Sequence, residues 1–284
     1  MLPSRCDLKR PADRPKPDLF CFFSLKMDAN RFLLCLACFL VGQSCMKGQE
    51  TIAQGALTYN VVDLFGKTPA LALARAAAAG SVDEVKKQIA AGVDPNTVGE
   101  HDVTPLWWAA WAQNLDGFRA LLTAQANPNF RRREGFSIMI LITRMKDPRF
   151  LELALQNGGD PNFRDVKPIK TPIFEAVMYS DADRQRQLLL QSGADLNAQD
   201  GNGQTPMMAA IAARKDYKLV WDFLQRGADY RLKTNYKRTL ADMIGVALID
   251  PQSDQYLWRE KVIEFLRSKG IEAHRPTNEI PRGQ

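Results

Sequence analysis

A short motif recurs along this chain at a nearly constant interval. Successive copies lie 33, 33, 35 and 34 residues apart, at Asp94-Pro95-Asn96, Asn127-Pro128-Asn129, Asp160-Pro161-Asn162, Asp195-Leu196-Asn197 and Asp229-Tyr230-Arg231. A second marker, Thr-Pro, begins at Thr104, Thr171 and Thr205, and Ser137 fills the same register between the first two. Self-similarity over roughly 20 to 50 residues indicates a solenoid, in which each unit buries its apolar face only against its neighbours.

Each interval reads as two helices followed by a hairpin. Proline after threonine begins the first helix, because its missing N–H would be unpaired in the first turn. Small residues, as at Ala109-Ala110, then let this helix approach the next unit closely. The second helix has apolar residues at helical intervals, for example Leu115, Phe118, Leu121 and Leu122. Glycine is expected to end it in the left-handed conformation, at Gly92, Gly159, Gly193 and Gly227.

These motifs resemble the ankyrin repeat. TPLWWAA at 104–110 follows that family's T-P-L-H-x-A-A, and SGADLNAQDGNGQTPMMAA at 192–210 holds a complete junction between two units. The resemblance covers residues 71–270 and implies an all-α solenoid of about six helix-turn-helix units joined by β-hairpin-like loops. The units are expected to begin at Leu71, Thr104, Ser137, Thr171, Thr205 and Thr239. Thr68-Pro69 is out of register by three residues, and we interpret it as a decoy or as a cap turn.

The segments that flank the repeats are expected to cap them. Residues 46–70 would form a tether and an N-terminal cap. At the other end, an insertion around Asp250–Tyr256 and a charged final helix, Arg259–Lys269, suit a unit that faces solvent. Residues 271–284 would form a flexible tail.

The N-terminal residues have the layout of a secretory signal. The apolar run Phe32–Val41 follows Arg31 and precedes small and polar residues. It is too short to span a bilayer as a helix. Residues 27–45 are therefore predicted to be a signal peptide, in which Cys35 and Cys38 belong to the apolar core. Translation is expected to start at Met27, which would make residues 1–26 a mis-assigned or disordered leader.

Cys45 stands directly after the apolar core and resembles the cysteine of a bacterial lipobox. That resemblance implies a lipid on Cys45 and, because Met46 rather than aspartate follows, the outer membrane. Gly42 stands where that family prefers leucine, so cleavage by signal peptidase I without a lipid remains an open alternative. Either way the predicted location is the periplasm, and the absence of cysteine after position 45 suits an oxidising compartment.

The rest of the chain has few features that would support nucleic-acid binding, catalysis or metal binding. The net charge is +6, and residues 1–45, with seven basic and four acidic side chains, account for half of it. The remaining excess is too small for the concentrated basic stripe that nucleic acid requires. No G-x-S-x-G, H-E-x-x-H or phosphate-loop motif occurs, and His101 and His274 lack partners at metal-ligand spacing. We predict a protein that is not an enzyme and that uses no metal or cofactor.

Ankyrin-like stacks bind proteins through their hairpin tips and the concave face of their first helices. The side chains expected on that face are Trp111, Arg144, Met145, Met178 and Tyr179. An exposed aromatic residue near arginine is typical of an interface hot spot, although simple packing of Trp111 is the competing interpretation. Trp107 and Trp108 are expected to fill the core, with a partner for each indole N–H.

The densest charge run of the repeats, Arg131, Arg132 and Arg133, falls on a hairpin. Such runs are usually solvated turns. The alternative hypothesis is that these three side chains meet an acidic patch on a partner.

Four segments depart from the ankyrin consensus and resemble a narrower group of ankyrin-repeat proteins. They are TPLWWAAW at 104–111, GGDPN at 158–162, TPIFEAV at 171–177 and GADY at 227–230. Together with the export signal they resemble the ankyrin-repeat immunity proteins found beside type VI secretion lipase toxins. This resemblance implies a protein, monomeric alone, that occludes a phospholipase-like toxin and meets the membrane only through its N-terminal lipid. The alternative is a periplasmic scaffold that supports a resident enzyme, such as one in oxidative-stress defence.

Overall fold

The computed structural model describes residues 51–54, 57–66, 68–166 and 169–274. The predicted leader, the signal peptide with Cys45, and residues 275–284 of the predicted tail lie outside these ranges. The strands β1 (Thr51–Gln54) and β2 (Leu57–Asn60) form a two-stranded sheet, of which residues 53–54 and 57–58 belong to a separate compact unit. Within the described ranges, no helix has both the length and the apolar character needed to cross a membrane.

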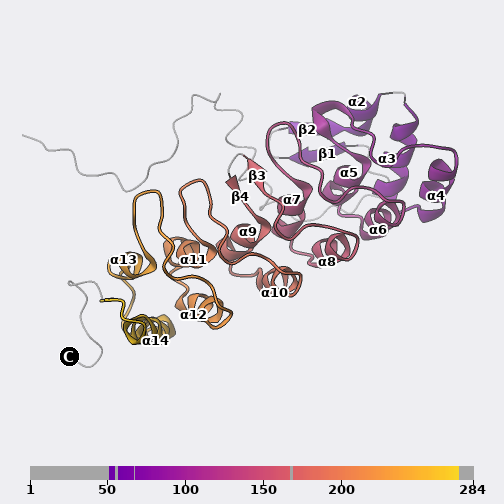
Figure 1. Cartoon of the computed structure of the whole chain (residues 1–284). Helices are drawn as coiled ribbons and strands as arrows, with labels where there is room; N and C mark the ends of the chain where they lie inside the picture. Colours follow the sequence, from indigo (N-terminus) through magenta and orange to yellow (C-terminus); the bar gives the residue numbers. More distant parts are fainter. Residues whose placement is uncertain (1–50, 55–56, 67, 167–168, 275–284) are drawn as a thin grey trace, which may run out of the picture. The chain divides into compact units, whose positions relative to one another are not determined.

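Six successive helix pairs make up the repeats, as predicted. The pairs are α3 (Pro69–Ala79) with α4 (Val82–Ala90), α5 (Pro105–Trp111) with α6 (Leu115–Thr123), α7 (Ile138–Arg144) with α8 (Arg149–Gln156), α9 (Pro172–Met178) with α10 (Asp183–Gln191), α11 (Pro206–Arg214) with α12 (Tyr217–Gln225), and α13 (Leu240–Ile244) with α14 (Asp254–Ser268). The short helices α2 (Val61–Phe65) and η2 (Glu100–Asp102) complete the helical set of the described residues. In Figure 1, α7, α9, α11 and α13 follow one another in a row, and α8, α10, α12 and α14 form a second row beside it.

The first repeat begins three residues earlier than predicted. Thr68 is the N-cap of α3 and Pro69 is its first residue, as Thr104 and Pro105 are for α5. The prediction that the unit starts at Leu71, with Thr68-Pro69 as a decoy or a cap turn outside it, was therefore wrong. The physical reason is that α3 has 11 residues where α5 has 7. The extra turn is rich in alanine, the residue with the highest helix propensity, so the helix continues where other repeats stop.

The recurring Asp-x-Asn motif connects each repeat to the next. The Asp160 carboxylate accepts a hydrogen bond from the backbone N–H of Asn162, two residues on, at 2.8 Å. The Asn162 side chain then reaches the following loop. Its amide Nδ2 donates to the carbonyl of Gly193 at 3.0 Å, and its Oδ1 accepts from the backbone N–H of Asp195 at 2.7 Å. Asn129 makes the same two contacts with Gly158 and Asp160, so the motif is an inter-repeat clamp.

Glycine ends the second helices in three of the four predicted places. Gly92, Gly193 and Gly227 have φ of +87°, +84° and +85°. In the third repeat the left-handed residue is Gly158, with φ +84°, and not the predicted Gly159. Gly159 is required for a different reason, because a Cβ there would lie 2.7 Å from the carbonyl oxygen of Ala154.

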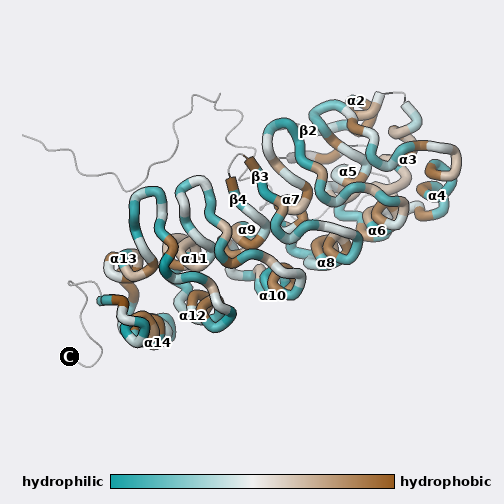
Figure 2. The backbone as a smooth tube through the Cα atoms, viewed as in Figure 1, coloured by the Kyte–Doolittle hydropathy of each residue, from teal (hydrophilic) through white to brown (hydrophobic). Residues whose placement is uncertain are grey.

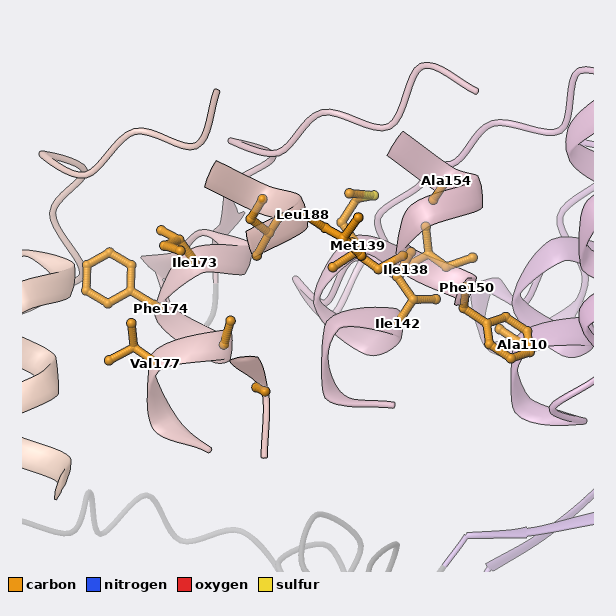
Figure 3. Packing of buried hydrophobic residues seen from close by; sticks show 14 of the residues in the cluster. Ala110, Ile138, Met139, Ile142, Phe150, Ala154, Ile173, Phe174, Val177 and Leu188 are labelled. Carbon is orange, nitrogen blue, oxygen red and sulfur yellow. The ribbon is translucent and has the colours of Figure 1, made fainter. Parts of the chain in front are cut away.

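The core runs between successive helix pairs. Figure 3 shows buried side chains of neighbouring repeats, among them Ile138, Phe150 and Ile173, in the space between the helices. Trp107 and Trp108 are buried, as predicted. The accompanying prediction of a partner for each indole N–H was wrong, since neither nitrogen has a hydrogen-bond partner among the described residues. The Trp107 ring instead lies under the guanidinium of Arg132, 5.4 Å from its centroid.

The last repeat is less exposed than predicted. Helix α14 begins at Asp254, inside the segment expected to be an insertion. Its apolar side chains Val262, Ile263 and Leu266 are buried. Arg259 is fully buried as well, with its guanidinium 5.0 Å from the centre of the Tyr256 ring, so this helix does not simply face solvent.

Candidate protein-binding surface

The hairpins between repeats are joined by backbone hydrogen bonds into a row. The backbone N–H of Val166 donates to the carbonyl of Gly135 at 3.3 Å, and that of Gly201 donates to Ile169 at 3.2 Å. The N–H of Asn235 then donates to Asn202 at 2.9 Å. Four successive hairpins, 131–137, 165–170, 200–204 and 234–238, are thereby held in fixed positions relative to their neighbours.

The second hairpin of this row exposes two apolar side chains. It pairs β3 (Asp165–Val166) with β4 (Ile169–Lys170), with Val166 opposite Ile169. Both side chains are exposed, by 46% and 38%. Figure 2 shows this hydrophobic character in β3 and β4, whereas the next two hairpins along the chain are mostly hydrophilic.

Exposed apolar residues also occur at the ends of the first helices, where Met178 is the last residue of α9 and Val246 lies two residues after the end of α13. Met178 is the seventh residue after Thr171, Val246 is the seventh after Thr239, and their side chains are 47% and 70% exposed. Trp111 has the same position in its own repeat. We use the term hairpin-side surface for the exposed large apolar residues of the hairpins from 165 onward and of the C-terminal ends of the first helices, namely Val166, Ile169, Met178, Tyr236 and Val246.

Trp111, one of the predicted partner contacts, has several aromatic neighbours within the chain. Its ring stacks on Tyr59, with centroids 5.4 Å apart and an interplanar angle of 29°. Trp107 meets it edge-on at 5.9 Å, and the Arg132 guanidinium lies 5.9 Å from its centroid. The side chain is half-buried as a result. Packing, the competing interpretation of Trp111, therefore has direct support, and contact with a partner stays a prediction.

The arginine run divides into one packed and two exposed side chains. Arg132 donates from Nε to the carbonyl of His101 at 2.7 Å and covers the two tryptophan rings. Arg131 is exposed but donates to the carbonyl of Arg164 at 2.8 Å. Arg133 donates to Asp102 at 2.7 Å with 87% of its side chain in solvent. Burial opposes ionisation of Asp102, but the hydrogen bonds from Arg133 hold its pKa below the ordinary value.

Arg144 lies in a charged cluster beneath the surface. It forms a salt bridge with Glu175, whose side chain is buried, and Lys170 forms a second one. Burial alone would raise the pKa of Glu175, but the charges of Lys170 and Arg144 hold it below its ordinary value. Asp165 is buried nearby and accepts from the backbone N–H of Ser137 at 2.9 Å. For this carboxyl burial dominates and raises the pKa.

Of the two predicted methionines and Tyr179, the structure exposes only Met178. Met145 and Tyr179 are half-buried, and their backbone carbonyls accept hydrogen bonds from side chains of α10 and α11. The carbonyl of Met145 accepts from Gln185 at 2.8 Å, and that of Tyr179 accepts from Arg186 and from Arg214, both at 2.9 Å. The eight predicted contact residues are therefore not one exposed patch.

Sequence reasoning missed most of the hairpin-side surface, although two signals were present. Val246 occupies the register position of Trp111 and Met178. The longer interval of 35 residues before Asp195 marks the enlarged hairpin that carries Val166 and Ile169. Elsewhere on the described ranges, no group of His, Cys, Asp or Glu side chains could hold a metal ion.

Comparison with known proteins agrees with this architecture. Residues 138–234 match a family model described as ankyrin repeats in three copies, and residues 101–133 match a model of a single ankyrin repeat. The chain contains ankyrin repeats. Ankyrin-repeat folds are typically binding scaffolds without catalytic activity, and they imply a protein partner.

Individual relatives share these ankyrin repeats. Protein PhlB of Serratia liquefaciens is 29% identical over 194 residues, which are 67% of this chain and 84% of that protein. SH3 and multiple ankyrin repeat domains protein 1 of Mus musculus is 32% identical over 129 residues, which are 44% of this chain but 6% of that protein. The crystal structure of the ankyrin repeat domain of Bcl-3 matches with a TM-score of 0.58 at 23% identity, and covers 73% of this chain and 88% of that one. At this identity the likeness shows the fold alone.

Proposed function

We propose that this ankyrin-repeat protein acts by binding another protein through the hairpin-side surface, without catalysing a reaction. The observation that carries the proposal is the exposure of Val166, Ile169, Met178, Tyr236 and Val246 on the hairpins and at the C-terminal ends of the first helices. Large apolar side chains in solvent cost free energy that a partner can recover by covering them. The hydrogen-bonded hairpins present these side chains in fixed positions, which lowers the entropic cost of association.

The residues at the position of Met178 and Val246 in other repeats indicate that the later repeats form the contact region. In the second repeat, the position that Met178 and Val246 occupy in theirs holds Trp111, which is already stacked on Tyr59. In the third repeat it holds Arg144, which is engaged with Glu175. Repeats four to six and the hairpin before them are therefore the proposed contact region.

The proposed partner is a secreted toxin with phospholipase-like chemistry, and the protein would be its immunity factor in the periplasm. This finer proposal rests on the export-signal pattern and on the resemblance of motifs such as TPLWWAAW to envelope immunity proteins. Its mechanism would be steric occlusion, with the solenoid covering the mouth of the toxin's active site or its membrane-docking face. Such inhibition needs an interface of roughly 1,600 Å² in total, for which several repeats must contribute.

Affinity capture tests the proposal. The purified full chain is immobilised and exposed to an envelope extract of the organism that encodes it, and the captured protein is then purified separately. Its lipid-hydrolysing activity is measured with increasing amounts of the ankyrin-repeat protein. The proposal predicts a one-to-one complex and complete loss of activity at equivalence.

Two other outcomes would distinguish failure of the immunity proposal from failure of the protein-binding proposal. Capture of an enzyme whose activity is unchanged or increased in the complex would contradict immunity and favour the periplasmic scaffold, while leaving protein binding intact. Failure to capture any stoichiometric partner would contradict the binding function itself.

A further inference from the structure

The tip of the last hairpin differs from the others in exposing an aromatic residue among unpaired cations. Tyr236 has 78% of its side chain in solvent, the largest exposure of any large hydrophobic residue on the described hairpins. Lys233, Lys237 and Arg238 surround it in sequence and are exposed as well. Within the described ranges, none of the three cations forms a salt bridge, whereas Arg231 in the same loop pairs with Asp229 at 2.8 Å. The charges of Lys233 and Arg238 contribute, after the hydrogen bonds from Thr239, to holding the pKa of Asp242 below its ordinary value.

This tip is held rigidly despite its exposure. The backbone N–H of Thr234 donates to Arg238 at 2.9 Å, and that of Lys237 donates back to Thr234 at 2.9 Å, which closes the turn. The Asn235 side chain donates to the carbonyl of Gly201 at 3.0 Å, and Gln199 donates to the carbonyl of Lys233 at 2.9 Å. Both contacts fix the tip against the preceding hairpin. A partner would meet charges whose backbone is already ordered.

The distribution of charge favours a protein segment over nucleic acid. The neighbouring hairpin carries Asp200 and no basic residue between positions 198 and 204, so the cations of the last tip are not part of a continuous stripe along the row. Nucleic-acid binding needs such a stripe to follow successive phosphates. A localised group of three cations around a tyrosine instead matches the composition of a protein hot spot, where an aromatic ring supplies contact area and cations select the partner's charge.

We infer that the tip formed by Lys233, Tyr236, Lys237 and Arg238 docks an acidic segment of the protein partner. Carboxylates of that segment pair with the three cations, and an apolar side chain beside them covers the Tyr236 ring. The inference rests on the proposed protein-binding function and adds the charge of the partner to it. Binding at this tip should weaken as salt concentration rises, since the pairs are solvent-exposed.

Peptide selection tests the inference even before the partner has been identified. Phage-displayed random linear peptides are selected on the full chain, and the recovered peptides are measured by fluorescence anisotropy. The tip variant combines Lys233→Gln, Lys237→Asn and Arg238→Gln. Asparagine is chosen at 237 because the backbone there is left-handed, with φ +63°. The matched control combines Lys86→Gln, Lys87→Gln and Lys218→Gln, which removes the same charge from the second helices α4 and α12.

The expected result is enrichment of Asp- and Glu-rich peptides whose affinity for the tip variant falls about tenfold, with a similar loss for Tyr236→Ser and none for the control. Neutral or basic peptides, or acidic peptides that bind the tip variant equally well, would overturn the inference while leaving protein binding elsewhere on the surface intact. Loss of binding to phosphatidylglycerol vesicles in the tip variant, with no acidic peptide selected, would overturn it in favour of a lipid headgroup. Failure of the proposed function would appear separately, as the absence of any captured partner.

Discussion

The Oδ1 atom of Asn162 lies 2.7 Å from the backbone nitrogen of Asp195, which is 33 residues further along the chain. The contact joins two successive repeats, and the other end of the same amide group bonds to Gly193. It gives a physical reason for the asparagine at the third position of four of the five copies of the loop motif, at Asn96, Asn129, Asn162 and Asn197. A side chain of another shape could not donate and accept across the junction at once.

Asn162→Ala should therefore destabilise the fold. The variant loses both inter-repeat hydrogen bonds, at an expected cost of about 1 to 2 kcal/mol in the free energy of unfolding. Urea denaturation followed by circular dichroism measures the change. Asn202→Ala, in a hairpin where the side chain makes no such inter-repeat bond to the described residues, is the control. Equal stability of the two variants would contradict the clamp.

Gly117 provides a test of how closely the first two repeats pack. Alanine in place of glycine inside a helix ordinarily stabilises it. Here a Cβ would overlap the backbone carbonyl of Ala77, so we expect Gly117→Ala to destabilise the protein by about 1 to 3 kcal/mol.

The matched control for Gly117 is Gly201→Ala. A Cβ at Gly201 meets only the Cβ of Ile169, at 3.8 Å, and should be nearly neutral. Thermal unfolding of both variants distinguishes the two sites. An increase in Tm for Gly117→Ala would show that α6 and α3 are further apart than described.

The sequence could predict the helix pairs because the motifs that begin and connect them recur at fixed intervals. Thr104, Thr171 and Thr205 act as N-caps in the predicted register. The same counting failed at Thr68, because a longer helix changes the interval without changing the motif. Periodicity describes an average unit, so it cannot reveal an extra turn in one copy.

The binding surface was harder to predict because exposure depends on partners distant in sequence. Trp111 is covered by Tyr59, 52 residues earlier, and Arg144 is engaged by Glu175, 31 residues later. Register placed both side chains on the first helices but could not show what lay over them. Met178 and Val246 share that register and remain exposed, since no neighbour among the described residues covers them to the same extent.

The buried carboxylate of Glu175 makes Arg144 a stabilising residue. Arg144→Met leaves Glu175 with one cation fewer, and we expect the free energy of unfolding to fall by about 1 to 3 kcal/mol. Adding Glu175→Gln to that variant should recover part of the loss, because the remaining group is neutral. A double-mutant cycle in urea measures the coupling. A coupling energy near zero would contradict the stabilising role of Arg144.

Asp165 should make stability depend on pH in the opposite sense to most carboxylates. Because burial raises its pKa in the folded protein, the folded state holds this proton more tightly than the unfolded state. Its contribution to stability is then fully present below the unfolded pKa of about 3.8 and is lost as pH rises through the higher folded value. Asp165→Asn keeps an acceptor for the Ser137 N–H and removes the titration.

Unfolding curves across the acid range measure this effect. The stability of the wild type relative to Asp165→Asn should decrease as pH rises from about 4 toward neutrality. A difference that stays constant with pH, or that grows in favour of the wild type, would contradict the assigned direction.

Binding through the hairpin-side surface is tested by the affinity of the purified captured partner for two surface variants, measured by isothermal titration calorimetry. Met178→Asp combined with Val246→Asp places charges on this surface, where both side chains are already exposed, so the fold should be retained. Leu257→Asp makes a similar change at an exposed site on α14, in the row of second helices (Figure 1). We predict that the double variant weakens binding at least about a hundredfold, as loss of a hot spot does, and that Leu257→Asp leaves it unchanged. Unchanged affinity of the double variant would contradict the claim that the protein acts through this surface.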